Sequence, residues 1–216
     1  VTLDGGSSTC KDARIISYRW QKDYRDIAEG QLTKVRLPFG EHVIHLVVTD
    51  SLGRSSRDVT VVHVGLDTAG YVNHALAARG AKAKAHLSHS GLDPANLIDG
   101  STTNNGMQGT WLSEPILASW WQVDMLAPRR IEYIVIHFRT DYPHQPQATD
   151  FEVWGGDTPD MLDHVVLARR VGNLPFPPGG LWNAPVTTGD KYRYLRVIKL
   201  SNAHTAMVEF SAHGLE

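Results

Sequence analysis

The chain has 216 residues, of which 42% are hydrophobic and 20% charged, so it can bury one large core or two small ones and disorder is not expected. Its formal net charge of −2 and isoelectric point near 6.6 give no broad attraction to phosphate backbones, which argues against nucleic acid as a partner. The sequence lacks the run of about 18 apolar residues that a spanning helix needs, so membrane insertion is not expected.

Residues 1–64 predict a small sandwich of short strands separated by turn-forming Gly, Asp, Ser and Pro. In residues 41–49, Ile44, Leu46 and Val48 fall on one face while His45 and Thr49 fall on the other, which is the period of a half-buried strand. The expected strands of this part are residues 1–3, 15–20, 31–37, 41–49 and 55–64.

Residues 65–70, with two glycines and no clear periodicity, predict a linker. A second all-β module is expected over residues 71–216, because loops rich in Gly, Pro and Asn separate its apolar stretches. Its expected strands are residues 120–125, 130–139, 150–154, 165–171, 192–200 and 206–213. One helical turn is expected over residues 94–98, with Asp93 as N-cap and Pro94 at the first position.

Cys10 is the single cysteine of the chain, so an internal disulfide is excluded and packing or a bound ion must hold each module together. The sequence opens on Val1 without a charged or apolar leader, which indicates an excerpt from a longer polypeptide.

Three motifs of residues 1–64, VTLDGGSS, IISYRW and LPFGEHVIHLVVTDSLGRSS, resemble the PKD family of immunoglobulin-like β-sandwiches. The segment QKDYRD, which follows Trp20, departs from the Gly-Asp-Gly turn of many members. The resemblance implies a rigid, extracellular spacer domain without chemistry of its own.

The second module resembles the discoidin, or F5/8 type C, family of jelly-roll β-sandwiches, which includes carbohydrate-binding modules and the fucose-binding F-type lectins. The motifs that carry this resemblance arrive in the family's order: NHALAARGAKAKA, PANLIDGSTTN, GTW, SWWQVDM, RRIEYIVIHFR, DFEVWGG, YRYLRVIKL and MVEFSAHG. The family implies a galactose-binding-like fold whose loops, at one end of the sandwich, hold the ligand.

The segment NLIDGS resembles the loop that, in F-type lectins and related modules, wraps a structural Ca²⁺ ion together with the last strand. This resemblance implies an all-oxygen ligand set, which suits Ca²⁺. The implied ligands are the carbonyls of Asn96, Ser101, Thr110 and Val208, the hydroxyl of Thr110, and the carboxylates of Asp99 and Glu209. The alternative is that Asp99 and Gly100 merely form a turn.

The segment after the strand at 130–139 resembles the F-type lectin loop in which an Arg and, two residues later, an Asp contact the sugar. Arg139 and Asp141 match this loop. A guanidinium only donates hydrogen bonds and a carboxylate only accepts them, so the two side by side suit the vicinal hydroxyls of a sugar. The other basic positions of the fucose signature are occupied by Pro146 and, upstream, Leu112. The alternative is a surface ion pair worth about 0–1 kcal/mol.

Three further residues are candidates for the same ligand site: His144 as a replacement donor, and Tyr142 or Trp182 as the aromatic face for a sugar. Trp182 could instead cover the end of the sandwich. The pair Asp141 and His144 is too weak a signal for an enzyme, and the histidines lack the spacing of a transition-metal site.

The sequence therefore predicts a non-catalytic, extracellular or cell-surface carbohydrate-binding module with a structural Ca²⁺, carried on a PKD-like spacer in a larger secreted or surface protein. The expected partner is a glycan, of galactose or fucose type, and a monomer is expected. The alternative is an adhesion or protein-interaction module of the discoidin type, which exposed apolar loop tips would favour.

Overall fold

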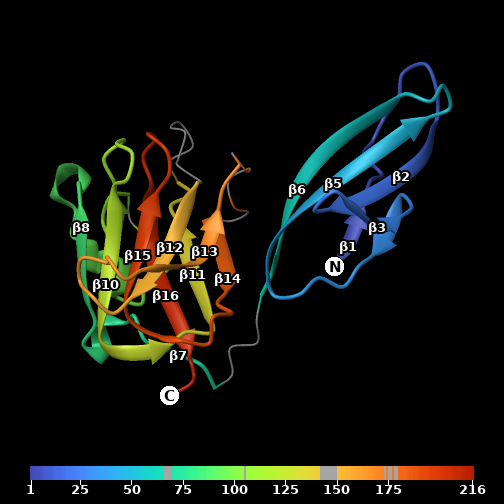
Figure 1. Ribbon diagram of the computed structural model, residues 1–216. Helices are drawn as coiled ribbons and strands as arrows, with labels where there is room; N and C mark the ends of the chain where they lie inside the picture. Colours follow the sequence, from blue (N-terminus) through green and yellow to red (C-terminus); the bar gives the residue numbers. More distant parts are fainter. Residues whose placement is uncertain (66–69, 105, 142–149, 173, 175–176, 178–179) are drawn as a thin grey trace. The chain divides into compact units, whose positions relative to one another are not determined.

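The structure is a computed structural model that describes the chain except residues 66–69, 105, 142–149, 173, 175–176 and 178–179, and the side chain of His63 (Figure 1). Contacts divide the chain into two compact units, Val1–Leu66 and Asp67–Glu216. In the described residues both units are built from strands, and the helices are short 3-10 turns. The all-β prediction is therefore confirmed. None of the described helices is long and apolar enough to span a bilayer.

The first unit contains a four-stranded sheet in the order β3-β2-β5-β6 and a two-stranded sheet in which β1 pairs β4. The strands are β1 (Thr2–Asp4), β2 (Ile15–Lys22), β3 (Arg25–Glu29), β4 (Leu32–Lys34), β5 (Gly40–Asp50) and β6 (Ser55–Val64). All pairs are antiparallel. The strand expected over residues 31–37 is shorter, and β3 was not expected at all.

Strand β3 forms because a two-residue turn, which the sequence pattern did not predict, reverses the chain after β2. Lys22 pairs with Arg25, and the intervening Asp23 and Tyr24 both have positive φ, of 50° and 61°. Two such residues give the twist that a tight hairpin requires. The segment QKDYRD, although it lacks the Gly-Asp-Gly turn, therefore still reverses the chain.

The core of the first unit is small. Leu3, Trp20 and Ile44 form its buried cluster, and partly buried neighbours such as Leu46 and Val62 pack against it. The Trp20 indole donates to the Gly30 carbonyl at 2.9 Å, so its polar edge is satisfied.

The second unit contains two larger antiparallel sheets, one in the order β13-β12-β15-β10-β8 and one in the order β14-β11-β16-β7, with β9 beside β16. Their strands are β7 (Val72–Asn73), β8 (Lys82–His86), β9 (Trp111–Leu112), β10 (Trp120–Arg130), β11 (Tyr133–Phe138), β12 (Phe151–Gly156), β13 (Val165–Arg170), β14 (Leu181–Pro185), β15 (Lys191–Lys199) and β16 (Ala206–Gly214). Three 3-10 turns complete the unit: η1 (Ala77–Arg79), η2 (His89–Gly91) and η3 (Pro94–Ile98).

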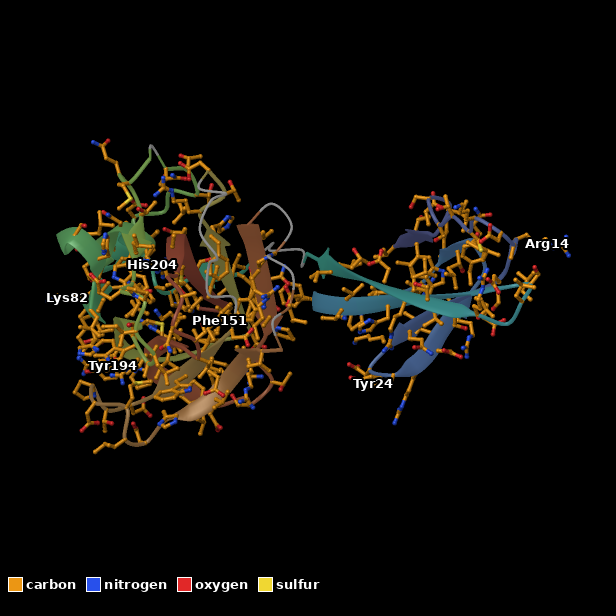
Figure 2. All side chains as sticks on the ribbon, turned by 90° about the horizontal axis from the view of Figure 1, so that it is seen from above. Arg14, Tyr24, Lys82, Phe151, Tyr194 and His204 are labelled. Atoms are coloured by element: carbon orange, nitrogen blue, oxygen red, sulfur yellow. The ribbon has the colours of Figure 1, made fainter. Side chains whose placement is uncertain are left out.

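The inner faces of the two sheets bury a large aromatic core. Trp121 and Phe210 have ring centroids 4.9 Å apart, and Phe151 meets Trp182 edge to face at 4.8 Å. Figure 2 shows Phe151 among the strands of this unit, whereas Tyr24 projects outward from the first. This core gives the loops at the sandwich ends a rigid base.

Turn η3 anchors the loop that follows it. The Asp93 carboxylate accepts from the Ala95 N–H at 2.9 Å and Pro94 opens the turn, as predicted. Leu97 and Ile98 are buried, and the Trp121 indole donates to the Pro94 carbonyl at 2.9 Å. The buried turn therefore fixes the position of Asp99, the residue that follows it.

Candidate functional site

Four loops meet at one end of the second unit, the upper end in Figure 1, and we call residues 87–91, 113–119, 139–141 and 200–205 the loop-end site. Ser88 and Ser113 form an isolated bridge, and the Ser113 N–H donates to the Thr205 carbonyl at 3.0 Å. The Arg139 N–H donates to the Ala206 carbonyl at 3.0 Å. Backbone hydrogen bonds therefore hold the four loops together.

Arg139 and Asp141 form a bidentate pair in this site. Nε of Arg139 donates to one Asp141 carboxylate oxygen at 2.6 Å, and an Nη donates to the other at 3.2 Å. The Arg139 side chain is 8% exposed and that of Asp141 45%, so the guanidinium is buried while the carboxylate reaches the surface. The hydrogen bond from Arg139 lowers the pKa of Asp141, which stays ionised and keeps an exposed accepting face.

The segment before β9 supports this pair from the side. The Asn104 amide donates to Asp141 at 3.2 Å, and an Nη of Arg139 lies 3.0 Å from the Met107 sulfur. Sequence reasoning did not assign Asn104 or Met107 to the ligand site. Asn104 ends the motif PANLIDGSTTN and Met107 follows it, and both lie more than 30 positions before Arg139.

The other predicted ligand residues divide into two groups. Tyr142 and His144 lie outside the described residues. Trp182 lies on β14 in the core and is 2% exposed, so the prediction that its ring faces a sugar is corrected. The surrounding Pro and Gly residues suggested a loop, but Trp182 pairs with Ile136 inside a sheet and packs on Phe151.

A second polar cluster occupies the loop-end site, and no sequence motif indicated it. His89 Nδ1 lies 3.0 Å from the Glu114 carboxylate, and both side chains are about one third exposed, at 39% and 33%. The His204 ring meets the His89 ring edge to face at 5.5 Å. An acceptor and two imidazoles thus gather from three loops.

Buried Lys199 fixes the loops that carry this cluster. Its ammonium donates to the Ser113 hydroxyl at 3.1 Å, to the Ala203 carbonyl at 2.6 Å and to the Glu114 carbonyl. Burial lowers the pKa of Lys199 to about 8. A lysine with three backbone and hydroxyl acceptors acts as a clamp rather than as a ligand-binding group.

The residues of the predicted ion site lie together, although they come from three parts of the chain. The Asn96 amide donates to the Thr110 carbonyl at 2.9 Å, and the Ser101 N–H donates to the Asp99 carboxylate at 2.7 Å. The fully buried Thr110 hydroxyl donates to the Met107 carbonyl at 2.7 Å. The same loop therefore holds both the ion-site residues and the Met107 that contacts Arg139.

Glu209 is the buried carboxylate of this site. Its side chain is buried, with the residue 3% exposed, and one carboxylate oxygen, Oε2, has no hydrogen-bond partner. Burial, and then the charge of Asp99, raise the pKa of Glu209 to about 8, while a hydrogen bond from the Gly100 N–H opposes this. A buried carboxylate beside a second one needs a proton or a cation.

A bulge in β16 contributes the last predicted ligand. Met207 pairs with Phe138 and Glu209 with His137, so Val208 is an extra residue without a partner on β11. Such a residue leaves the regular ladder. The bulge therefore leaves Val208, next to Glu209, outside the pairing of β16 with β11.

The donor set fits Ca²⁺, which prefers carboxylate, carbonyl and hydroxyl oxygens. Within the described part of the chain, no group of three or more His, Cys, Asp or Glu side chains is placed to hold a metal ion. The ion site predicted around Asp99 and Glu209 has only two carboxylates, so it depends on neutral oxygens for its other ligands and stays a prediction.

The acidic run in residues 157–163 is a structured turn whose carboxylates accept hydrogen bonds from within the same run. The Asp163 carboxylate accepts from the Asp157 N–H at 2.8 Å and from the Thr158 hydroxyl at 2.6 Å. Asp160 accepts from the Leu162 N–H at 3.2 Å. These hydrogen bonds lower the pKa values of Asp160 and Asp163.

Comparisons with known proteins agree with the fold. A fucose-binding module of Streptococcus pneumoniae has a TM-score of 0.53 at 24% identity and covers 66% of this chain and 95% of its own. A chitosan-binding module from a chitosanase/glucanase of Paenibacillus sp. has a TM-score of 0.51 at 17% identity, covering 66% and 99%. A serum fucolectin of striped bass, Morone saxatilis, has a TM-score of 0.57 at 16% identity, covering 96% and 74%. The likeness shows the discoidin-like β-sandwich fold of lectins and carbohydrate-binding modules.

Two curated proteins match part of the sequence. The human dyslexia-associated protein KIAA0319 is 39% identical over 77 residues, which is 31% of this chain and 7% of that protein. Its homologue in Rattus norvegicus is 38% identical over 74 residues, again 7% of its length. The chain therefore spans less than a tenth of these relatives. No family model matches the chain.

Proposed function

We propose that the second unit is a non-catalytic carbohydrate-binding module whose ligand occupies the loop-end site. The observation that carries this proposal is the Arg139–Asp141 pair, in which a buried guanidinium orients an exposed carboxylate at the end of a rigid sandwich. An oriented carboxylate accepts from sugar hydroxyls, and charged hydrogen bonds are the stronger sort. The solved structures with this fold are described as binding fucose, chitosan and Lewis b, which supports the same ligand class.

The residues of the loop-end site have different roles in binding. Because Arg139 is buried and already donates to Asp141, we assign it a positioning role, and Asp141 is the group that contacts the sugar. His89 and Glu114, with His204 beside them, offer further donors and an acceptor at the same end. Galactose and fucose remain the sugar types to test first.

The experiment is a glycan array probed with the whole chain in the presence of Ca²⁺. Asp141→Asn removes the acceptor charge and is expected to lower binding about tenfold or more, since a hydrogen bond to a charged group contributes about 1.5–3 kcal/mol. The matched control is Asp190→Asn, in the loop between β14 and β15. Absence of any glycan above background would refute the proposal.

We also propose a structural Ca²⁺ ion between Asp99 and Glu209. The unpaired, buried Glu209 oxygen supports it, because a cation would neutralise the two carboxylates and supply the missing partner. Asn96, Ser101, Thr110 and Val208 would complete the oxygen set. A bound ion would hold the loop that carries Met107 and Asn104, and so steady the Arg139–Asp141 pair. Calorimetric titration of chelated protein with Ca²⁺ tests this directly.

For the first unit we propose a PKD-like spacer role within a larger secreted or cell-surface protein. Its small core, antiparallel sheets and structured turns suit a scaffold domain. Mass-spectrometric recovery of the native protein from culture medium or the cell surface tests the location.

One observation favours the second candidate function, an adhesion module that binds protein. Ile116 and Leu117 are 50% and 56% exposed in the loop-end site. Apolar loop tips suit protein contact. The double variant Ile116→Ser, Leu117→Ser would abolish adhesion but leave sugar binding intact, whereas Asp141→Asn would do the reverse.

A further inference from the structure

The four-stranded sheet of the first unit is covered unevenly on its inner face. Asp58 and Thr60 of β6 stand opposite Leu46 and Ile44 of β5, and therefore share the face that looks into the core. Ile44 is fully buried, yet Asp58 and Thr60 are exposed, as are all residues from Ser55 to Thr60. Among the described strands of the first unit, none lies over this part of β6.

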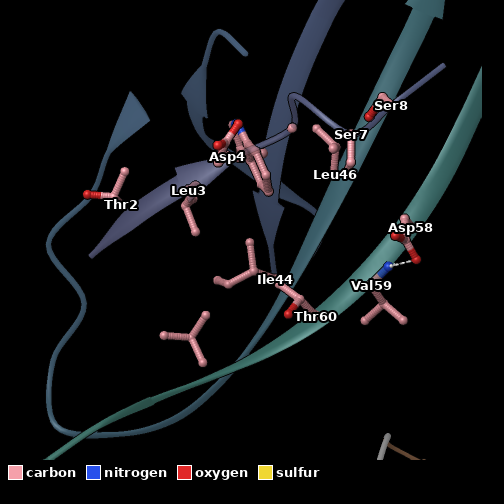
Figure 3. Close-up of a pocket in the computed structure, with 13 residues that line it drawn as sticks. Thr2, Leu3, Asp4, Ser7, Ser8, Ile44, Leu46, Asp58, Val59 and Thr60 are labelled. Atoms are coloured by element: carbon pink, nitrogen blue, oxygen red, sulfur yellow. Dashed lines mark hydrogen bonds between the residues drawn. The ribbon is translucent and has the colours of Figure 1, made fainter. Parts of the chain in front are cut away.

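A groove of about 280 Å³ marks the uncovered region, between β1 and β6 (Figure 3). Leu3, Ile44 and Leu46 point into it in the figure, and its apolar lining also includes Trp20, Val59 and Val62. Each flanking strand has a single partner among the described strands, β4 for β1 and β5 for β6. Both borders of the groove are therefore open sheet edges.

The backbone of β6 points hydrogen-bonding groups along its open edge. The Val59 N–H donates to the carboxylate of Asp58 at 2.8 Å, drawn in Figure 3, rather than across to β5. Backbone groups alternate between the two sides of a strand, so Arg57 and Val61 direct theirs to the same open side. Such an edge accepts an added strand.

The charge of the groove indicates which kind of peptide strand could bind there. Asp4 and Asp58 line it together with the hydroxyl groups of Thr2, Ser7, Ser8 and Thr60. The described lining residues include no lysine or arginine. An acidic rim over an apolar floor complements a segment that alternates apolar and basic side chains.

We propose that the groove between β1 and β6 binds an extended segment of a partner protein, which adds as a strand to the β6 edge. Its apolar side chains pack on Leu3, Ile44 and Leu46, and its basic side chains meet Asp4 and Asp58. The first unit then has an interaction site of its own, separate from sugar binding.

The test is an NMR titration of the isotope-labelled whole chain with a capped peptide of sequence GKVTVKVG. We expect amide shifts confined to β1, β6 and the groove lining, and a peptide with Glu in place of both Lys should bind at least tenfold more weakly. Asp58→Lys should also weaken the first peptide at least tenfold, whereas the matched charge change Asp12→Lys, outside the groove, should not. Val59→Pro should block binding without unfolding, because it removes an outward N–H at an edge.

Three outcomes would overturn the proposal. One is no shift on β6 at millimolar peptide, and another is equal binding of the Lys and Glu peptides. The third is the same β6 shifts on raising protein concentration alone, which would make a second copy the occupant. If Val59→Pro fails to fold, the Asp58→Lys and Asp12→Lys pair decides.

Discussion

The two units differ greatly in the size of their buried apolar clusters, and this difference fits the separate roles that we propose for them. Of the described residues, the second unit buries a cluster of 23, with three tryptophans among them, whereas the cluster of the first contains Leu3, Trp20 and Ile44. A large packed core holds loops in fixed positions. The second unit can therefore present oriented side chains such as Asp141, while the first leaves part of its inner face open.

The largest loss of stability is expected from a substitution in the core of the second unit. Trp121 is fully buried and donates to the Pro94 carbonyl, so Trp121→Ala should destabilise the second unit by about 3–5 kcal/mol. Differential scanning calorimetry should show one of two transitions shifting down and the other unchanged. Trp121→Phe should recover much of the loss, since it keeps most of the packing. A joint shift of both transitions would mean that the units do not unfold independently.

The next effect is a pH dependence confined to the second unit. Burial, and then nearby His74, lower the pKa of His213 to about 4. The unfolded chain, with an ordinary pKa near 6.5, therefore takes up the proton first as pH falls, so stability is present above about pH 6.5 and is lost toward pH 4, by at most about 3 kcal/mol.

Urea unfolding at pH 7, 5.5 and 4 measures this loss. His213→Gln cannot titrate, so it should lose less stability than the unmodified chain over this range. Identical pH profiles for the two proteins would show that His213 does not drive the acid sensitivity.

Calcium removal should affect the second unit alone. A saturating chelator should lower its unfolding free energy by about 2.7 kcal/mol relative to Ca²⁺ at 100 times its dissociation constant. Glu209→Gln should abolish this response, and without Ca²⁺ it should be at least as stable as the unmodified chain, because it removes a buried charge. Melting curves with and without Ca²⁺ decide. An unchanged curve for the unmodified chain would eliminate the ion site.

The smallest effect concerns the turn that leads into the ion site. Asp93→Ala removes the cap on Ala95 and should cost about 1 kcal/mol. Asp93→Asn, which keeps an accepting oxygen, should cost less. Thermal unfolding followed by circular dichroism compares the two variants, and equal losses would assign the effect to charge rather than to capping.

Much of the fold could be predicted because apolar alternation marks strands that cover a core. The pattern of Ile44, Leu46 and Val48 predicted β5, and the Asp93–Pro94 pair predicted η3. Strand β8 was missed because Lys82 and Lys84 alternate with small alanines at a sheet edge. Strand β14 was missed because prolines and glycines precede Trp182, which the fold nevertheless draws into the core.

The candidate site could be predicted only where a motif is local. Arg139 and Asp141 were predicted because their segment resembles the F-type lectin loop, and the two residues, only two positions apart, do form a pair. The burial of Arg139 and its contact with Met107 depend on a loop 32 positions away, so local sequence does not indicate them. The His89–Glu114 pair likewise joins loops 25 positions apart.

NMR mapping of a bound sugar tests whether sugar binds at the loop end of the second unit. Titration of the labelled chain with the strongest ligand from the array should shift amides in residues 87–91, 113–119, 139–141 and 200–205. Asp141→Asn should weaken these shifts, and Asp190→Asn should not. Shifts confined to other surfaces, or none at saturating sugar, would show that sugar does not bind at this site.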